Sequence, residues 1–393
     1  MAQIERFTID VSDGALADLR RRVAETRWPV SPPDPHWAEG VDVAYLRDLA
    51  SYWCDGFDWR AQEVRLNELS QVVVNLDGVR IHAVHVRGTG DRTLPLVLTN
   101  GWPSTFTEFV KVIGPLTDPG SYGGDPADGF DVVVPSLPGY GFSDPLPAGQ
   151  AGVVTHLWAE LMSALGYVRF GAHGSDIGGY VTNRLALEYP DRLIGLHTTY
   201  PVEPWIDSSE ELSAHEQEFW LDRPRGKERG GGYTHIQRTR PVTLAYGLTD
   251  SPVGLAAWIL DKWREWSDCG GELSTRFSRD ELLTNVSLYW LTGTIGSSFR
   301  FYRDWGLGVP PELVDEYPHA LPGVEPKPLP VGQRIAVPAG VACFGHGYPP
   351  DFVLRGYADL RRWSPMPTGG HFPALEEPGL LVENIRAFYR PLR

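Results

Sequence analysis

The sequence predicts an α/β protein with a largely parallel sheet and a helical segment inserted late in that sheet. Three observations carry this prediction. Short apolar segments alternate with helical patterns from about residue 94 to residue 199, which is typical of a sheet covered on both faces. The alternation stops near Pro204 and resumes at Ile335. Between an expected strand and an expected helix, residues 173–179 form a sharp turn flanked by glycines.

The first 70 residues are expected to form a helical extension, because apolar side chains recur at helical spacing in three segments. The expected helices cover residues 15–27, 43–56 and 59–68. A proline-rich run that begins at Pro29 ends the first of them. Residues 72–86 then predict a β-hairpin that turns at Asp77-Gly78. On a strand His82 and His85 point to opposite faces, which argues against a metal site there.

The core and its insertion follow in order along the chain. Buried strands are expected at residues 94–99, 130–135, 168–172, 193–199 and 335–344, and helices at 153–165 and 180–189. From about Pro204 to Pro330 the sequence is helical, aromatic and interrupted by Gly and Pro. Open α/β sheets bind ligands at the carboxyl ends of their strands, so we expect this insertion to cover that edge as a lid. The predicted domains are an N-terminal extension (1–70), a core in two parts (71–203 and 331–393) and the lid (204–330).

The composition is that of an ordinary globular protein and excludes several classes of partner. The net charge of −15 argues against nucleic acid and anionic membranes, because both require a basic surface. No stretch approaches the roughly 18–20 apolar residues of a membrane span, and the N-terminus lacks a secretory signal pattern, so we expect a cytoplasmic protein. The three cysteines match no metal pattern and are expected to be free thiols. The oligomeric state, a homodimer included, is left open.

Asp176 stands where a serine hydrolase carries its nucleophile. The motif Gly174-Ser175-Asp176-Ile177-Gly178 lies between an expected strand and an expected helix, which is the context of a nucleophile elbow. A carboxylate that attacked an ester or amide would give an unstable mixed anhydride. Attack on an electrophilic sp3 carbon gives an ordinary ester that water can cleave, so epoxides and alkyl halides fit as substrates. The motif alone is equally compatible with an aspartate that only caps the following helix.

A base and an acid are expected further along the chain, in the order nucleophile, acid, histidine. The motif Gly369-Gly370-His371-Phe372-Pro373 places His371 on a loop between an expected strand and an expected helix. Asp351 is the only carboxylate in the loop after the strand that ends at Phe344. We expect Asp351 to orient His371 and also to cap the next helix. Asp359 lies deeper in that helix and is a weaker candidate.

The backbone amides of Trp102 and Ile177 are expected to form an oxyanion hole. The turn Asn100-Gly101-Trp102-Pro103 directly follows a strand, and Ile177 directly follows Asp176. In hydrolases of this kind, an amide after an early strand pairs with the amide after the nucleophile. The two would stabilise the tetrahedral anion that forms when water attacks the ester. The Trp102–Pro103 bond is a candidate for a cis peptide.

Together these residues resemble the microsomal-type epoxide hydrolases of the α/β-hydrolase superfamily, over nearly the whole chain. The elbow at Asp176 and the Gly-Gly-His-Phe motif at His371 match that family. Residues 19–29 are similar to the N-terminal region that distinguishes this type, and residues 232–237 and 299–303 match two motifs of its lid. The resemblance implies an α/β-hydrolase fold and an epoxide as the substrate.

The resemblance also assigns roles to two lid tyrosines. It implies that Tyr233 and Tyr302 hydrogen-bond the epoxide oxygen and protonate the leaving alkoxide, a task that suits a phenol. This chain departs from the family in two places: Asn100 stands where the family often has His, and the loop before Asp351 is lengthened. The family's acid can also be Glu. Without the membrane anchor of eukaryotic relatives, the chain resembles soluble bacterial members, some of which serve polyketide or enediyne antibiotic pathways.

The predicted function is that of a cofactor-free epoxide hydrolase, with a small-molecule epoxide and water as partners and no metal. A haloalkane or haloacid dehalogenase would share the nucleophile and the base. Dehalogenases commonly place a Trp beside the nucleophile to bind halide, whereas this chain has Ile177 there. A non-catalytic binding protein on the same fold is the remaining alternative, and it gives no reason to keep nucleophile, acid, base and both tyrosines. The many aromatic residues of the lid suggest a bulky aryl or polyketide-like epoxide.

Overall fold

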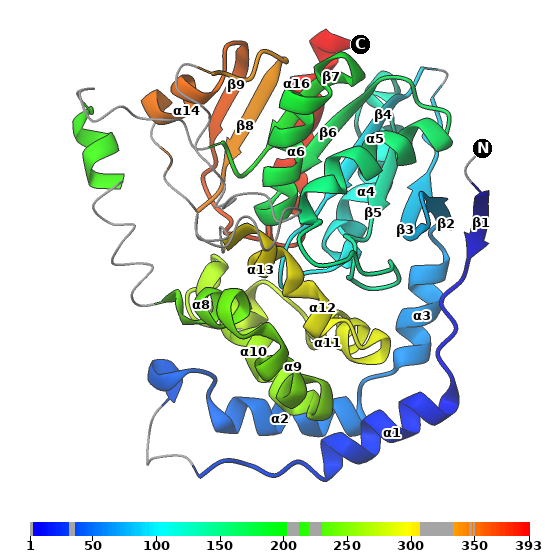
Figure 1. Cartoon of the computed structure of the whole chain (residues 1–393), viewed down its shortest axis with the longest axis vertical. Helices are drawn as coiled ribbons and strands as arrows, with labels where there is room; N and C mark the ends of the chain where they lie inside the picture. The colour runs from blue at the N-terminus through cyan, green and yellow to red at the C-terminus, as the bar shows by residue number, and fades with distance from the viewer. Residues whose placement is uncertain are drawn as a thin grey trace, which may run out of the picture.

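One mixed β-sheet forms the centre of the molecule (Figure 1). The structure is a computed structural model, and it describes residues 3–30, 36–90, 92–202, 212–219, 230–306, 333–345, 348 and 350–393. Within these residues the strand order is β1-β2-β3-β5-β4-β6-β7-β8-β9. The strands are β1 (Gln3–Phe7), β2 (Gln71–Leu76), β3 (Val79–Val86), β4 (Leu94–Thr99), β5 (Phe130–Pro135), β6 (Phe170–Gly174), β7 (Leu193–Thr198), β8 (Ala339–Cys343) and β9 (Leu360–Pro365).

Most of the sheet is parallel, which confirms the predicted fold class. Strands β4 to β9 run parallel to one another, whereas β1, β2 and β3 join one edge in antiparallel pairing. β2 and β3 form the predicted hairpin, whose turn residues Asp77 and Gly78 have φ values of 50° and 86°. Every residue of β5 and β6 is buried, as expected for strands covered on both faces.

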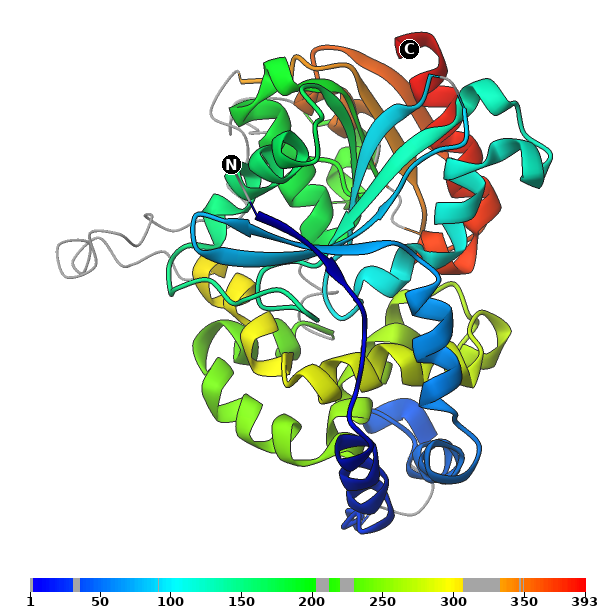
Figure 2. The ribbon, with the colours of Figure 1, turned by 90° about the vertical axis from the view of Figure 1, so that its right-hand side faces the viewer.

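Helices cover both faces of this sheet. The core helices are α4 (Val110–Thr117), α5 (Val154–Ala164), α6 (Asp176–Glu188), α14 (Pro350–Gly356), α15 (Pro373–Glu376) and α16 (Pro378–Tyr389). α4 packs against α16, and α5 packs against α6 on the opposite side of the sheet (Figure 2). The strand ends that carry the candidate site therefore project from a rigid three-layer core.

A helical lid lies over one end of the sheet. Its helices are α8 (Gly232–Thr239), α9 (Pro241–Asp250), α10 (Pro252–Trp266), α11 (Arg279–Thr292), α12 (Ile295–Ser298) and α13 (Arg300–Gly306). Trp102, in the turn after β4, contacts Tyr233 of α8 and Tyr302 of α13, so the lid covers the carboxyl ends of the strands. Residues 204–211, 220–229 and 307–330 of the predicted lid lie outside the described residues. The four domain boundaries stay a prediction.

The N-terminal helices pack against this lid: the first two lie on its side away from the sheet, and the third runs beside it toward the sheet (Figures 1 and 2). They are α1 (Asp13–Ala24), α2 (Val43–Asp55) and α3 (Trp59–Asn67). The Tyr52 hydroxyl of α2 donates to Asp280 Oδ1 of the lid at 2.7 Å. The indole N–H of Trp53 donates to Ser287 Oγ at 3.1 Å. The extension and the lid therefore form one continuous packed layer.

Four predicted elements have other bounds in the structure. The first helix is Asp13–Ala24 rather than 15–27: Ser12 caps its start by accepting from the Ala15 amide at 3.3 Å. The strand before the elbow is Phe170–Gly174 rather than 168–172, and its helix begins at Asp176 rather than 180. The expected strand 335–344 is shortened to Ala339–Cys343, because Ile335 makes only an isolated bridge to Tyr357.

The two histidines of the hairpin are hydrogen-bonded inside the protein. His82 Nδ1 lies 2.9 Å from Ser136 Oγ, and its Nε2 lies 2.9 Å from Gln71 Oε1. His85 Nε2 lies 3.0 Å from the Tyr167 hydroxyl. Both rings therefore serve the packing of the sheet.

The described part of the chain holds no helix with the length and apolar character needed to cross a bilayer. Its three cysteines, Cys54, Cys269 and Cys343, are free thiols, as the sequence predicts.

Candidate active site

The elbow around Asp176 has the predicted strand–turn–helix form. β6 ends at Gly174, and α6 begins at Asp176, whose φ of 50° is a left-handed conformation that residues other than glycine seldom adopt. Gly178 is required here, because a Cβ atom on it would lie 1.8 Å from the Thr99 carbonyl oxygen. Such strain is typical of functional turns and projects the Asp176 side chain from the end of the strand.

Asp176 does not serve as the N-cap of α6. Ser175 occupies the N-cap position, and Asp176 is the first residue within the helix. The Asp176 carboxylate instead faces the turn after β4, where its Oδ1 accepts a hydrogen bond from the Trp102 amide at 3.0 Å. The geometry therefore favours the elbow interpretation over the helix-cap alternative.

His371 lies on the other side of the same carboxylate. Its Nε2 is 3.5 Å from Asp176 Oδ2, and only 10% of its side chain is exposed. Burial lowers the pKa of His371 to about 4, so the imidazole is neutral at neutral pH and able to accept a proton. The structure thus brings Asp176, His371 and the Trp102 amide together from three segments far apart in sequence.

Residues 100–104, which carry the first predicted oxyanion amide and which we call the oxyanion turn, are bound by side chains of both the core and the lid. The Trp102–Pro103 peptide is cis, as predicted. Asn285 Nδ2 of α11 donates to the Pro103 carbonyl at 2.8 Å, and the Tyr289 hydroxyl donates to the Ser104 carbonyl at 2.9 Å. Asn100 Nδ2 donates to the Gly101 carbonyl at 3.0 Å, so in this chain the Asn100 side chain shapes the turn.

Ile177 is buried in the first turn of α6, next to Asp176. Amides of a first helical turn have no partner within their own helix and are available to an anion. The Ile177 amide is thus placed suitably for the predicted oxyanion hole, and its role stays a prediction.

The sequence analysis missed a buried carboxyl beneath the elbow, Glu108. The Ser175 hydroxyl donates to Glu108 Oε1 at 2.8 Å, and the Ser104 hydroxyl donates to Oε2. Burial, aided by the charge of Asp176, raises the pKa of Glu108 to about 7. Glu108 therefore joins the residue before Asp176 to the oxyanion turn. Its signal in the sequence was an acidic residue between Phe106 and Phe109, both of which are buried.

The two lid tyrosines meet above the oxyanion turn. Tyr233 stacks on the Trp102 ring at 5.3 Å between centroids, and Tyr302 meets the same ring edge-on at 5.9 Å. Their ring centroids are 5.8 Å apart, and the two rings meet edge to face at 78°. Burial is the main cause that raises the pKa of both phenols. The charge of Asp176 adds to it for Tyr233, and the neighbouring Tyr233 phenol adds to it for Tyr302. Both therefore keep their protons at neutral pH.

Asp351, the predicted partner of His371, stands at the start of α14. Asp351 lies in the first turn of α14 with its side chain exposed, whereas the His371 ring is buried. Asp359 is bound to Arg361 in an exposed ion pair at 2.9 Å. His346, Gly347 and Pro349 of the loop that leads to Asp351 lie outside the described residues. The role of Asp351 as the orienting acid stays a prediction.

The comparisons with known proteins agree with this fold and site. A model described as "Epoxide hydrolase N terminus" matches residues 4–109, and one described as "alpha/beta hydrolase fold" matches residues 95–230. A relative from Stigmatella aurantiaca, which carries the provisional name epoxide hydrolase, is 39% identical over 99% of this chain and 86% of its own. Epoxide hydrolase 1 of Sus scrofa is 34% identical, over 98% of this chain and 88% of its own.

A solved structure extends this similarity to three dimensions. The structure of the Aspergillus niger epoxide hydrolase matches with a TM-score of 0.81 at 27% identity, over 100% of this chain and 97% of the other. The fold is therefore that of the α/β-hydrolases. Within that class, the chain belongs to the epoxide hydrolase family, with the N-terminal extension of that family.

Proposed function

We propose that this protein hydrolyses an epoxide to a vicinal diol through a covalent ester on Asp176. The proposal rests on the different contacts of the two Asp176 carboxylate oxygens. Oδ1 accepts a hydrogen bond from the Trp102 amide, whereas Oδ2 lies 3.5 Å from His371 Nε2. Two protonated phenols, Tyr233 and Tyr302, lie over the same turn. A nucleophile, a proton donor and a base thus converge on one point.

In the first step, Asp176 Oδ2 attacks one carbon of the ring. The new bond joins Oδ2 to that carbon, and the bond from the carbon to the epoxide oxygen breaks with its electron pair on oxygen. A proton from Tyr233 or Tyr302 neutralises this alkoxide and leaves a tyrosinate. The phenol is restored in the second step, when the Asp176 carboxyl group ionises and releases the second proton of the attacking water. The raised pKa of both phenols suits this role, because the proton is released only to a strongly basic oxygen.

In the second step, water attacks the Asp176 carboxyl carbon while neutral His371 accepts its proton. Oδ1, which was the carbonyl oxygen of the ester, becomes the oxyanion next to the Trp102 amide. The tetrahedral adduct then releases the diol together with the old Oδ2, and His371 returns the proton to that oxygen. The water oxygen remains in the carboxylate.

The remaining assignments are proposals of smaller weight. Asp351 orients His371, and Ile177 contributes the second oxyanion amide. Trp102, Trp266 and the two tyrosines offer aromatic surfaces that suit an aryl-substituted epoxide. The reaction as written uses only the epoxide, water and residues of the chain. A cytoplasmic location, a homodimer and a place in an antibiotic pathway stay predictions.

Turnover in water enriched in 18O tests the covalent route. After many turnovers of styrene oxide, mass spectrometry of the peptide that contains Asp176 should show the label in the Asp176 carboxylate. In the first turnover, the diol should be unlabelled, because its new oxygen comes from Oδ2. A labelled first-turnover diol with no label in the peptide would mean direct attack by water. Halide release from bromoalkanes, measured alongside, would instead indicate a dehalogenase.

A further inference from the structure

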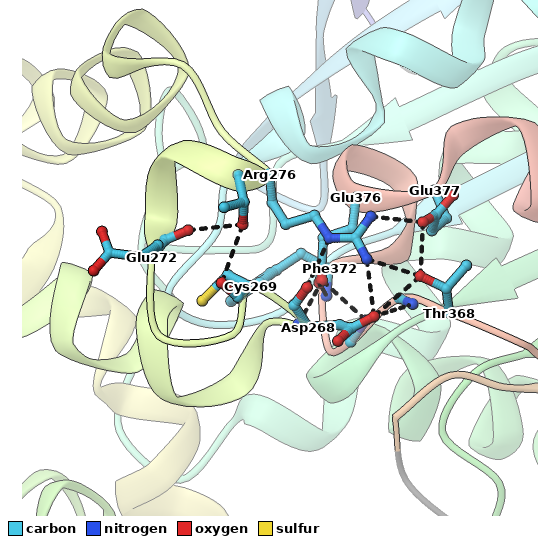
Figure 3. Close-up of polar contacts among 11 residues, drawn as sticks. Asp268, Cys269, Glu272, Arg276, Thr368, Phe372, Glu376 and Glu377 are labelled. Carbon is cyan, nitrogen blue, oxygen red and sulfur yellow. Dashed lines mark hydrogen bonds and ion pairs between the residues drawn. The ribbon is translucent and has the colours of Figure 1, made fainter.

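The loop that carries His371 is bound to the lid by a compact set of polar contacts (Figure 3). The set consists of Asp268 and Arg276, which lie in the lid between α10 and α11, and of Thr368, Glu376 and Glu377, which flank His371 in sequence. We call these five residues the clamp. None of them contributes to the two chemical steps proposed above.

Arg276 makes two of the contacts that cross from the lid to the core. Its Nη1 donates to Glu377 Oε1 at 2.6 Å, and its Nη2 donates to Thr368 Oγ1 at 2.8 Å. The same Nη2 donates to Asp268 Oδ2 at 2.9 Å, and Nε donates to the Asp268 carbonyl at 2.7 Å. Because four bonds leave one planar guanidinium, the two segments are held in one relative orientation.

Glu376 fixes the backbone on both sides of the base. Its Oε2 accepts from the Gly370 amide at 2.9 Å, and its Oε1 accepts from the Phe372 amide at 2.9 Å. Oε2 also accepts from the Asp268 amide of the lid at 2.7 Å. The amide of His371 itself donates to the Trp266 carbonyl at 2.9 Å. Three consecutive amides at the base are thus bound to one buried carboxylate and to the last residue of α10.

The two segments are also in close van der Waals contact. A Cβ atom on Gly370 would lie 2.5 Å from the Asp268 nitrogen and 2.6 Å from the Trp266 carbonyl oxygen, so only glycine permits this approach. Trp263 of α10 stacks on Phe372, with 4.8 Å between ring centroids. Any movement of the lid segment would therefore shift the backbone that carries His371.

We propose that the clamp sets the position of His371 against Asp176, and that Arg276 is a positioning residue for hydrolysis of the ester. The lid tyrosines share the same support, since Trp266 packs against both Tyr233 and His371 at centroid distances of 5.2 Å and 5.0 Å. The lid thereby places the proton donors of the first step and the base of the second. This inference rests on the proposed two-step function.

The test separates the two steps in an Arg276→Met variant of the full chain. Rapid mixing with styrene oxide, acid quench and intact-mass measurement give the rate of ester formation and the rate of its decay. The ester should form within about threefold of the wild-type rate and decay about 10–100-fold more slowly, because small misplacements of a base cost rates of this order. Both KM and kcat should then fall, because the ester accumulates.

Two further variants keep the test decisive. Arg276→Lys retains one charged donor and should restore part of the decay rate, and it is the working variant if Arg276→Met does not fold. Arg390→Met is the matched control: Arg390 also donates to a buried carboxylate, through Nε to Asp128 Oδ1 at 3.1 Å, but far from the site. It should leave both rates unchanged.

Two results would overturn the inference. If the rates of ester formation and ester decay fall equally in Arg276→Met, the clamp has only a structural role. If the rate of ester decay is unchanged, Arg276 does not position His371. The failure of the proposed function would look different, because the wild-type protein would then turn over styrene oxide with no ester detectable at any mixing time.

Discussion

The proposed nucleophile and the proposed base of this enzyme are held by different parts of the molecule. Asp176 stands between a wholly buried strand and a core helix, and Glu108 joins the residue before it to the oxyanion turn. His371 lies on a loop after an edge strand, and its backbone is bound to lid residues. The elbow is therefore held by core residues, whereas the loop of the base is held by contacts with the lid.

This difference matters because the two steps of the reaction use the two regions unequally. In the proposed mechanism, ester formation needs the elbow and the lid tyrosines, whereas ester decay needs the elbow and the base. Substitutions in the elbow should reduce both steps, and substitutions around the base should reduce the second alone.

The largest effect is expected for Asp176→Ala. Without a carboxylate the ring cannot be opened covalently, so turnover should fall by at least about 10⁴-fold and no ester should be detectable by intact mass. The melting temperature of the variant, compared with that of the wild type, serves as the control for folding. Diol formation at more than a hundredth of the wild-type rate would contradict the covalent route.

The His371→Gln variant should form the ester and then retain it. Loss of the general base should slow ester decay by about 10²–10⁴-fold while formation continues. The measurement is intact mass after mixing with an excess of styrene oxide, which should show one equivalent of added substrate. A variant that turns over without accumulating this adduct would show that His371 is not the base.

Replacing both lid tyrosines with phenylalanine should have the opposite signature. In the variant with Tyr233→Phe and Tyr302→Phe, ester formation should slow by about 10²–10⁴-fold, because the alkoxide has lost its proton donors. Either single variant should lose less, since one phenol remains. Tyr167→Phe, which removes a buried phenol bonded to Asp131 at 2.8 Å, is the matched control and should keep both rates.

Glu108→Gln tests whether the elbow is held in place by a core residue rather than by the lid. An amide nitrogen donates and does not accept, so one of the bonds from Ser104 and Ser175 must reverse its direction, and both bonds lose an ionisable acceptor. The free energy of unfolding, measured in urea, should decrease by about 1–3 kcal/mol. The ratio of ester formation to ester decay should stay near that of the wild type. Accumulation of ester in this variant would break the proposed division.

The rate of ester decay should stay high in mildly acidic solution, because His371 remains neutral there. Because burial lowers the pKa of His371 to about 4, the ring loses its basicity only as the pH falls toward that value. The acid limb of ester decay in single turnovers should thus have its midpoint well below 6.5. A midpoint at or above 6.5 would contradict the buried position of His371.

Burial also lowers the pKa of His82, to about 3. The unfolded chain therefore binds a proton there before the folded chain does, and the free energy of unfolding should decrease as the pH falls below 6.5.

The sequence predicted the elbow well because its signal is local. A buried strand, glycines at fixed positions and a helix lie within about 20 residues, and steric limits on the turn leave few alternatives. The hairpin at Asp77 and the cis peptide after Trp102 were predicted for the same reason. The predicted bounds of helices and strands were wrong by a few residues. Capping by residues such as Ser12 decides where a helix begins.

The contacts between distant segments were missed because no local pattern encodes them. Glu108, Arg276 and Glu376 look in the sequence like ordinary charged residues near helix ends. Their roles arise from partners up to about a hundred residues away, such as the bond of the Asp268 amide to Glu376. The pairing of Asp351 with His371 rests on chain order and stays a prediction.

The sequence by itself determined the class of fold, the aspartate in the elbow and the motif that contains the histidine, because periodicity and glycine positions are local properties of the chain. Only the tertiary structure decided which oxygen of Asp176 is held by Trp102, how deeply His371 is buried and which lid residues bind its loop. Those properties depend on burial and on distances across the fold. They arise when the lid, the sheet and the N-terminal helices pack together.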